Sequence, residues 1–91
     1  MLKMVLTKDP GHGSTVHLEG QVIGPWVEEL RRVCEPMLTN GAGLRLDLSK
    51  VSFVSREGVR VLWGLRDQHA ALRNCSRFVA EQLKALEETT P

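Results

Sequence analysis

A cluster of hydroxyl and charged side chains between positions 49 and 58 is the part of the chain best suited to chemistry. It contains Ser49, Ser52, Ser55, Arg56, Glu57 and Gly58. The apolar periodicity that follows predicts a helix, and the unpaired N–H groups at its start would face this segment. A phosphate group on a serine would be well accommodated there. The plainer interpretation is a strand-to-helix connection with Ser55 as the helix N-cap, and composition alone favours it.

The other candidate residues do not combine into a catalytic or metal-binding motif. His12, His17 and His69 lack a second ligand at zinc-type spacing, so no metal is expected. The segment Gly11-His12-Gly13 superficially resembles a phosphate-binding loop, but it lies between two predicted strands instead of before a helix. No nucleophile–base pair is evident. We therefore expect no metal, no cofactor and no enzymatic activity.

Asp47 and the cysteines have simple structural interpretations. Asp47 stands in an apolar strand pattern, where we expect it to point outward or to accept hydrogen bonds from residues 49–55. His17 falls on the polar face of a predicted strand and should be exposed to solvent. Cys34 and Cys75 predict no disulfide framework and are expected to be two small buried apolar residues.

Composition narrows the class of protein further. Twelve Lys and Arg residues against 11 Asp and Glu residues give a net charge of +1, which argues against nucleic-acid binding. No apolar run approaches the ~20 residues that span a bilayer, and the start of the chain is too short in apolar residues for a signal peptide. The 91 residues, 42% of them hydrophobic, predict a single domain over 1–91, cytoplasmic and without a membrane partner.

The first half of the chain predicts a hairpin and a helix. Alternating apolar residues indicate strands over 2–7 and 14–19, joined by a turn rich in Gly and Pro. Gly24-Pro25 should open a helix, because proline is favoured at the first helical position. The apolar face of this helix reaches Leu38, but Pro36 should either kink its last turn or end its regular part near Cys34.

The second half predicts a strand, a helix, a strand and a helix. Residues 44–49 alternate strictly, and the apolar signal continues over 51–54 before a helix at about 57–68. A short strand is expected over 70–74. Ser76 is a plausible N-cap for the last helix. A competing interpretation makes residues 76–80 the strand, but the helix left over would then be marginally short.

This order of elements, β-β-α-β-α-β-α, defines the expected fold class. Strands that alternate with helices imply parallel neighbours in one sheet. We therefore predict an α/β fold with a four-stranded mixed sheet and three helices packed mainly on one face.

At residues 46–59 the sequence resembles the central signature of STAS domains, the anti-sigma-factor antagonist family. The segment LDLSKVSFVSREGV is similar to the family's hydrophobic-Asp-Leu-Ser pattern, which continues to Phe-Ile-Asp-Ser-Ser/Thr-Gly before a helix. Residues 18–20 and 24–30 resemble the Leu-x-Gly turn and first helix of the family. Residues 74–79 resemble its Val-Ser-Pro segment, with Arg77 in place of the proline. The resemblance covers nearly the whole chain.

The resemblance implies a non-enzymatic module that works by partner switching. Family members bind an anti-sigma factor kinase, which phosphorylates a Ser or Thr just before the signature glycine. That position is Glu57 here, and the family's Asp is Ser55. Glu57 cannot be phosphorylated and carries less negative charge than a phosphoserine. The stretch between Gly58 and Ser76 is also shorter than is usual in the family.

Two functional hypotheses follow from the resemblance. The favoured one is an interaction module of bacterial signalling that binds a protein partner, of the anti-sigma factor or kinase type, through a loop made of Ser52, Ser55, Arg56, Glu57 and Gly58. The alternative is a domain that senses a small ligand or nucleotide near residues 11–13 or at the helix start by Gly58. A deep pocket with convergent polar groups would favour the sensor.

Overall fold

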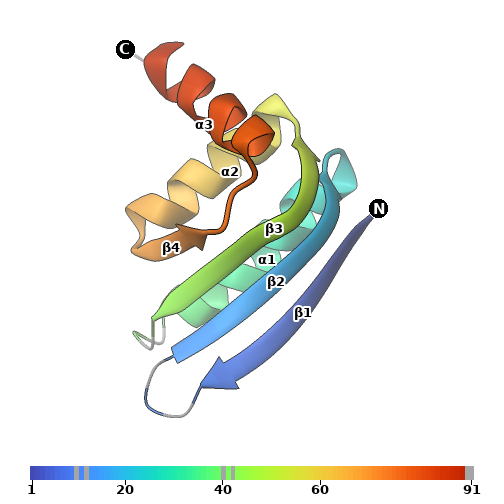
Figure 1. Cartoon of the computed structure of the whole chain (residues 1–91). Helices are drawn as coiled ribbons and strands as arrows, with labels where there is room; N and C mark the ends of the chain where they lie inside the picture. The colour runs from blue at the N-terminus through green and yellow to red at the C-terminus, as the bar shows by residue number, and fades with distance from the viewer. Residues whose placement is uncertain (10, 12, 40, 42, 90–91) are drawn as a thin grey trace.

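The computed structural model describes residues 1–9, 11, 13–39, 41 and 43–89, with the side chains of residues 86–89 left out. Seven elements follow one another along the chain (Figure 1): β1 (Leu2–Asp9), β2 (Gly13–Val22), α1 (Pro25–Thr39), β3 (Leu44–Val54), α2 (Arg56–Asp67), β4 (Ala70–Arg73) and α3 (Arg77–Thr89). The predicted order of strands and helices is confirmed.

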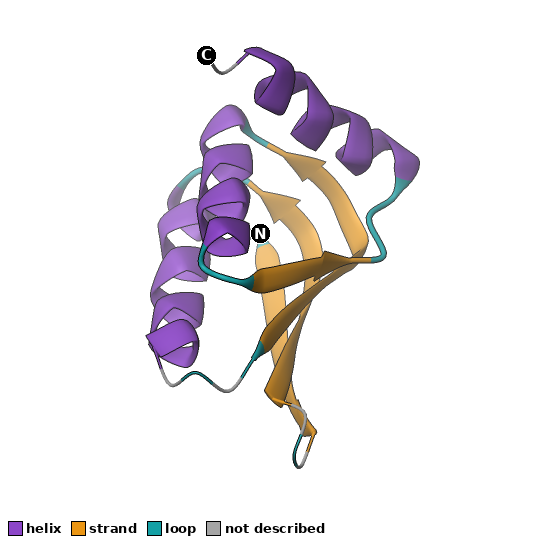
Figure 2. Ribbon diagram, turned by 90° about the vertical axis from the view of Figure 1, so that its left-hand side faces the viewer, coloured by secondary structure: helices purple, strands orange, loops and turns teal. Residues whose placement is uncertain are grey.

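The four strands form one mixed sheet in the order β1-β2-β3-β4. β1 and β2 pair antiparallel as a hairpin, whereas β2–β3 and β3–β4 pair parallel. Helices α1 and α2 lie side by side on one face of this sheet, while α3 runs past the C-terminal end of β3 (Figure 2). The predicted fold class is confirmed.

The core lies between the sheet and its helices. Leu44, Leu46 and Leu48 of β3 alternate inward and are buried, as strict strand alternation predicted. They meet buried residues at helical spacing on α1 and α2, namely Val27, Leu30 and Cys34 with Val59, Leu62 and Leu65. The period of each apolar pattern therefore determined which face of each element is buried.

The structure settles where β3 and α1 end. β3 runs without a break from Leu44 to Val54, in agreement with the apolar signal that continues over 51–54, and its register against β2 shifts between His17 and Glu19 and again between Gly20 and Gln21. Such an irregularity bends a strand without ending its pairing. α1 continues through Pro36 to Thr39, so an early end near Cys34 is wrong. Met37 and Leu38 pack against the core beyond the proline and account for the extra turn.

The start of α3 agrees with the favoured interpretation. Ser76 Oγ accepts a hydrogen bond from the backbone N–H of Val79 at 3.2 Å, the geometry of a helix N-cap. β4 ends at Arg73, so residues 76–80 are helix and cap instead of strand.

Candidate functional site

The start of α2 is tied to the C-terminal ends of the two central parallel strands. Ser55 Oγ accepts a hydrogen bond from Gly58 N at 3.1 Å and caps the helix. The backbone N–H of Ser55 donates to the carbonyl oxygen of Val22, which is the last residue of β2, at 3.0 Å. The helix begins directly after one connecting residue, so its position relative to the sheet is fixed by these bonds. The carboxyl ends of parallel strands are where α/β sheets commonly bind their ligands.

The sequence predicted a loop over residues 52–58, but the structure places most of these residues in β3 and α2. Ser52 belongs to β3, and its hydroxyl donates to Gly20 O at 3.3 Å. Ser55 alone connects strand and helix, and it is half-buried. Arg56 and Glu57 lie in the first turn of α2 and are exposed. Of the predicted partner-binding residues, these two present charged side chains to solvent.

Gly58 is buried and performs a packing role. A Cβ atom built on Gly58 would lie 2.8 Å from Val22 O and 2.8 Å from Val54 Cγ1. Both distances are shorter than real Cβ contacts, so only glycine fits where α2 crosses these strand ends. The glycine of the sequence signature therefore brings the helix close to the sheet instead of offering a surface to a partner.

Two exposed phenylalanines, one near the end of β3 and one in the first turn of α3, pack against each other, and sequence reasoning missed their pairing. Phe53 of β3 is 39% exposed and Phe78 of α3 is 57% exposed. Their ring centroids lie 6.3 Å apart with the planes tilted by 31°, which is a favourable aromatic arrangement. We call Phe53, Arg56, Glu57 and Phe78 the α2-start surface. The sequence signal for it was an aromatic residue directly before each of two apolar residues, Val54 and Val79, which the structure buries.

The opposite face of the sheet carries an imidazole–carboxylate pair. His17 Nδ1 lies 3.1 Å from Asp47 Oδ2, and Asp47 Oδ1 accepts from the backbone N–H of Ser49 at 2.9 Å. The Ser49 backbone N–H, together with further hydrogen bonds, lowers the pKa of Asp47 from 3.8 to about 2. Asp47 thus accepts hydrogen bonds as expected, while His17 is exposed but not isolated.

This pair does not by itself make a catalytic site. It lines a hollow of about 280 Å³ together with Lys3, Glu19 and Lys50. The hydrogen bonds of the described residues place no serine or cysteine nucleophile on the imidazole, which a triad needs. The pair therefore acts as a link between β2 and β3.

Metal-binding clusters and membrane-spanning helices are both absent from the described residues. Those residues contain no group of three or more His, Cys, Asp and Glu side chains that could hold a metal ion. His12, part of the turn considered for ligand binding, lies outside the described residues. Within the described part of the chain, no helix combines the length and apolar character needed to cross a membrane.

The similarity of this chain to known proteins is one of structure. No family model and no curated protein matches the sequence. The phosphorylated form of the Bacillus cell-fate determinant SpoIIAA is similar in structure, with a TM-score of 0.72 at 17% identity over 90% of this chain and 81% of that one. An anti-sigma factor antagonist from Mycobacterium paratuberculosis gives a TM-score of 0.73 at 18% identity, covering 100% of this chain and 84% of that one.

An antisigma-factor antagonist STAS domain from Rhodobacter sphaeroides is also similar, with a TM-score of 0.63 at 16% identity over 84% of this chain and 92% of that one. These identities establish shared architecture and not shared activity. The order of elements and the mixed four-stranded sheet agree with the resemblance seen in residues 46–59. The chain therefore has the STAS-like fold of anti-sigma-factor antagonists.

Proposed function

We propose that this chain is a non-enzymatic interaction module of bacterial signalling that binds a protein partner of the anti-sigma factor or kinase type through the α2-start surface. The proposal depends on one observation, an exposed aromatic pair that includes Phe53 of β3, followed three and four residues later in the chain by exposed charges of both signs. Phe53 and Phe78 contribute apolar area, while Arg56 and Glu57 contribute charge. Aromatic residues and Arg are enriched in the residues that dominate binding energy at protein interfaces.

The geometry of this surface suits a binding role because its backbone is already fixed. Gly58 packs against the strand ends, and Ser55 caps the helix. The side chains of the first turn are thus presented from a rigid element, which reduces the ordering cost of association. Arg56 adds a planar fork of donors that can pair with a partner carboxylate.

Glu57 gives the proposed module a fixed charge state. In the family that the sequence resembles, this position carries the hydroxyl that is phosphorylated, and one of the similar structures is a phosphorylated form. A glutamate carries about −1 permanently, against −1.5 to −2 for a phosphoserine. We therefore propose that binding here is not switched at residue 57 and that regulation comes from the availability of the partner.

The test begins with recovery of the partner from the native host by pull-down and mass spectrometry. The purified partner is then titrated against the wild type and against Arg56→Ala, Glu57→Lys and Phe78→Ala. Each change should weaken binding by about 5-fold or more, since interface residues that matter cost over ~1 kcal/mol. Thermal stability should change little in Arg56→Ala, because this side chain is exposed. Glu57→Lys and Phe78→Ala should each lower it slightly, because one reverses a favourable charge in the first turn of α2 and the other removes the contact with Phe53.

Lys8→Ala is the matched control. Lys8 is an exposed cation of β1 near the hairpin end, which lies at the far end of the molecule from the start of α2 (Figure 1). Its removal should leave the affinity unchanged. Unchanged affinity in Arg56→Ala, Glu57→Lys and Phe78→Ala would place the binding surface elsewhere and leave the helix start a structural connection only.

A further inference from the structure

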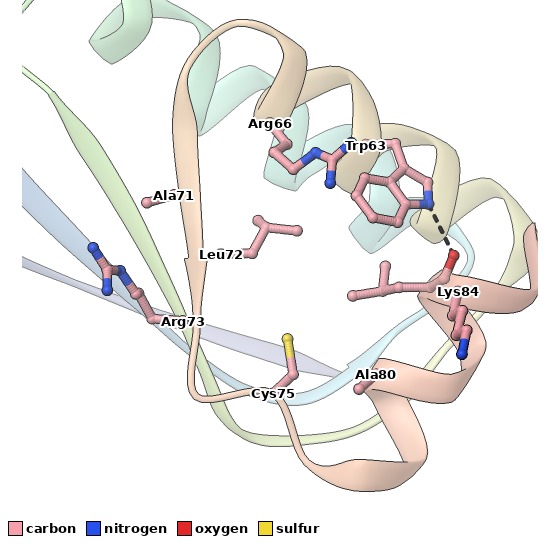
Figure 3. A pocket seen from close by; sticks show the side chains of 9 residues that line it. Trp63, Arg66, Ala71, Leu72, Arg73, Cys75, Ala80 and Lys84 are labelled. Atoms are coloured by element: carbon pink, nitrogen blue, oxygen red, sulfur yellow. Dashed lines mark hydrogen bonds between the residues drawn. The ribbon is translucent and has the colours of Figure 1, made fainter. Parts of the chain in front are cut away.

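A hollow of about 460 Å³ lies between α2, β4 and α3 (Figure 3), and none of the four residues of the α2-start surface lines it. Its volume is within the 300–1,000 Å³ range of small-molecule sites. The residues around it are Trp63 and Arg66 of α2, Ala71, Leu72 and Arg73 of β4, Cys75, and Ala80, Leu83 and Lys84 of α3. None of the functional hypotheses drawn from the sequence uses this place.

The interior of this hollow is apolar and its main wall is held in place. Leu72, Cys75 and Trp63 are only half-buried, so apolar side chains remain open to solvent there. Trp63 Nε1 donates a hydrogen bond to Leu83 O at 3.0 Å, which joins α2 to α3 across the hollow (Figure 3). The indole ring is therefore fixed as a flat wall before any ligand arrives.

The charges around the hollow have one sign. The guanidinium carbon of Arg66 lies 3.8 Å from the centroid of the Trp63 ring, so the cation sits on the aromatic wall. Lys84 adds a second cation from α3, whereas the side chain of Arg73 extends from β4 away from the hollow in Figure 3. The lining contains no Asp or Glu, and among the side chains that the structure describes, which end at residue 85, neither Arg66 nor Lys84 forms an ion pair. This arrangement is complementary to an anion.

We propose that the hollow binds a small carboxylate with an apolar body, either aromatic or of medium chain length. The apolar body would contact Trp63, Leu72 and Leu83, and the carboxylate would be held by Arg66 and Lys84 at the margin. The guanidinium of Arg66 uses its flat face on the indole, which leaves its N–H groups for a carboxylate. The ligand exists free in solution and needs no membrane.

The lining also selects against a nucleotide. Side-chain acceptors for the donors of a base or for ribose hydroxyls are missing, because the lining includes no Ser, Thr, Asn, Gln, Asp or Glu. The indole N–H of Trp63 is already used by Leu83 O. A phosphate ion alone could pair with the cations of Arg66 and Lys84, but it would bury none of the apolar surface of the hollow.

The first measurement is intrinsic fluorescence of the Trp26→Phe protein, in which Trp63 is the single indole. Decanoate and 2-naphthoate are titrated, with acetate, decanol and GMP as comparison ligands. We expect saturable fluorescence changes with decanoate and 2-naphthoate, at least 10-fold weaker binding of decanol, and no change with acetate or GMP.

Arg66→Gln and Lys84→Gln should each weaken decanoate binding by about 5-fold, near the upper value for an exposed ion pair. Arg60→Gln, which removes an exposed cation of α2 outside the hollow, should not.

A second measurement uses the wild type and does not depend on fluorescence. Cys75 lines the hollow and Cys34 is fully buried, so alkylation mapped by mass spectrometry has an internal control. Decanoate should slow alkylation of Cys75 and leave Cys34 unchanged. The proposal is overturned if neither decanoate nor 2-naphthoate binds and neither slows alkylation of Cys75. It is also overturned if decanol binds as tightly as decanoate, or if GMP slows alkylation of Cys75 as much as decanoate does. Protection of Cys75 by anionic vesicles or acidic peptides alone would likewise overturn it.

Discussion

The side-chain amide of Gln82 pairs with the backbone of Val54 as a neighbouring strand would. Val54 N donates to Gln82 Oε1 at 3.0 Å, and Gln82 Nε2 donates to Val54 O at 2.8 Å. β4 pairs with residues 44–47 of β3, so within the described part of the chain the end of β3 has no strand on that side. A hydrogen-bonded residue pair in a sheet exchanges both bonds in the same way. Gln82 thereby fastens α3 to the strand that leads into the α2-start surface.

Replacing Gln82 should destabilise the protein. Gln82→Ala leaves the N–H and C=O of Val54 without their partner at a partly buried position, which should cost about 1–3 kcal/mol in the free energy of unfolding. Urea denaturation measures the change. Gln68→Ala, at an exposed position at the end of α2, is the control and should change little. Equal stability of Gln82→Ala and wild type would show that water replaces the side chain without loss.

Two glycines of α2 should respond in opposite directions to the same substitution. Gly58→Ala forces a Cβ to 2.8 Å from Val22 O and should cost about 1–3 kcal/mol by overpacking. Gly64→Ala meets nothing within 4 Å and should gain up to about 1 kcal/mol, because alanine favours the helix. Thermal unfolding of both variants checks the pair. A tolerated Gly58→Ala would mean that α2 can shift away from the strand ends.

Asp47 should make the protein sensitive to acid. Its folded pKa, about 2, lies below the ordinary 3.8 because the Ser49 backbone N–H and further hydrogen bonds favour the carboxylate. The folded state therefore holds fewer protons, so this stabilisation is fully present above about pH 4 and is lost as the pH falls through 2. Asp47→Asn should lower stability at pH 7 and flatten its decline between pH 4 and 2.

Urea unfolding at several pH values measures both effects. Asp67→Asn, which removes an exposed carboxylate at the end of α2, is the control and should keep the wild-type slope over that range. An unchanged slope in Asp47→Asn would assign the acid sensitivity to other carboxylates.

A kinase of the anti-sigma type should not modify position 57, because Glu57 has no hydroxyl. The nearest hydroxyl, on Ser55, is half-buried and accepts the capping bond from Gly58 N. Intact-mass measurement after incubation with such a kinase should show no added phosphate on the wild type. Glu57→Ser restores a hydroxyl in the exposed first turn and is the matched substrate. Stoichiometric phosphate mapped to Ser55 or Ser52 of the wild type would mean that the switch has moved along the chain.

The sequence by itself determined the elements and their buried faces. Alternation over 44–48 required a strand with Leu44, Leu46 and Leu48 on one side, and this holds because successive strand side chains point to opposite faces. Ser55 and Ser76 were identified as caps because a short hydroxyl satisfies helix N–H groups locally. The order of strands and helices then limited the fold to a mixed sheet, since such connections favour parallel neighbours.

Only the tertiary structure decided which distant residues meet. The contact between Phe53 and Phe78, the bonds between Gln82 and Val54 and the hydrogen bond between His17 and Asp47 join residues that no local period relates. The structural roles of Ser52 and Gly58 also depend on tertiary packing. Ser52 lies in β3 because β3 remains paired with β2 as far as Val54. Gly58 lies against the strand ends because it has no Cβ atom to prevent the close contact of α2. The apolar hollow with its two cations at the margin exists because three separate elements converge there, which sequence spacing does not encode.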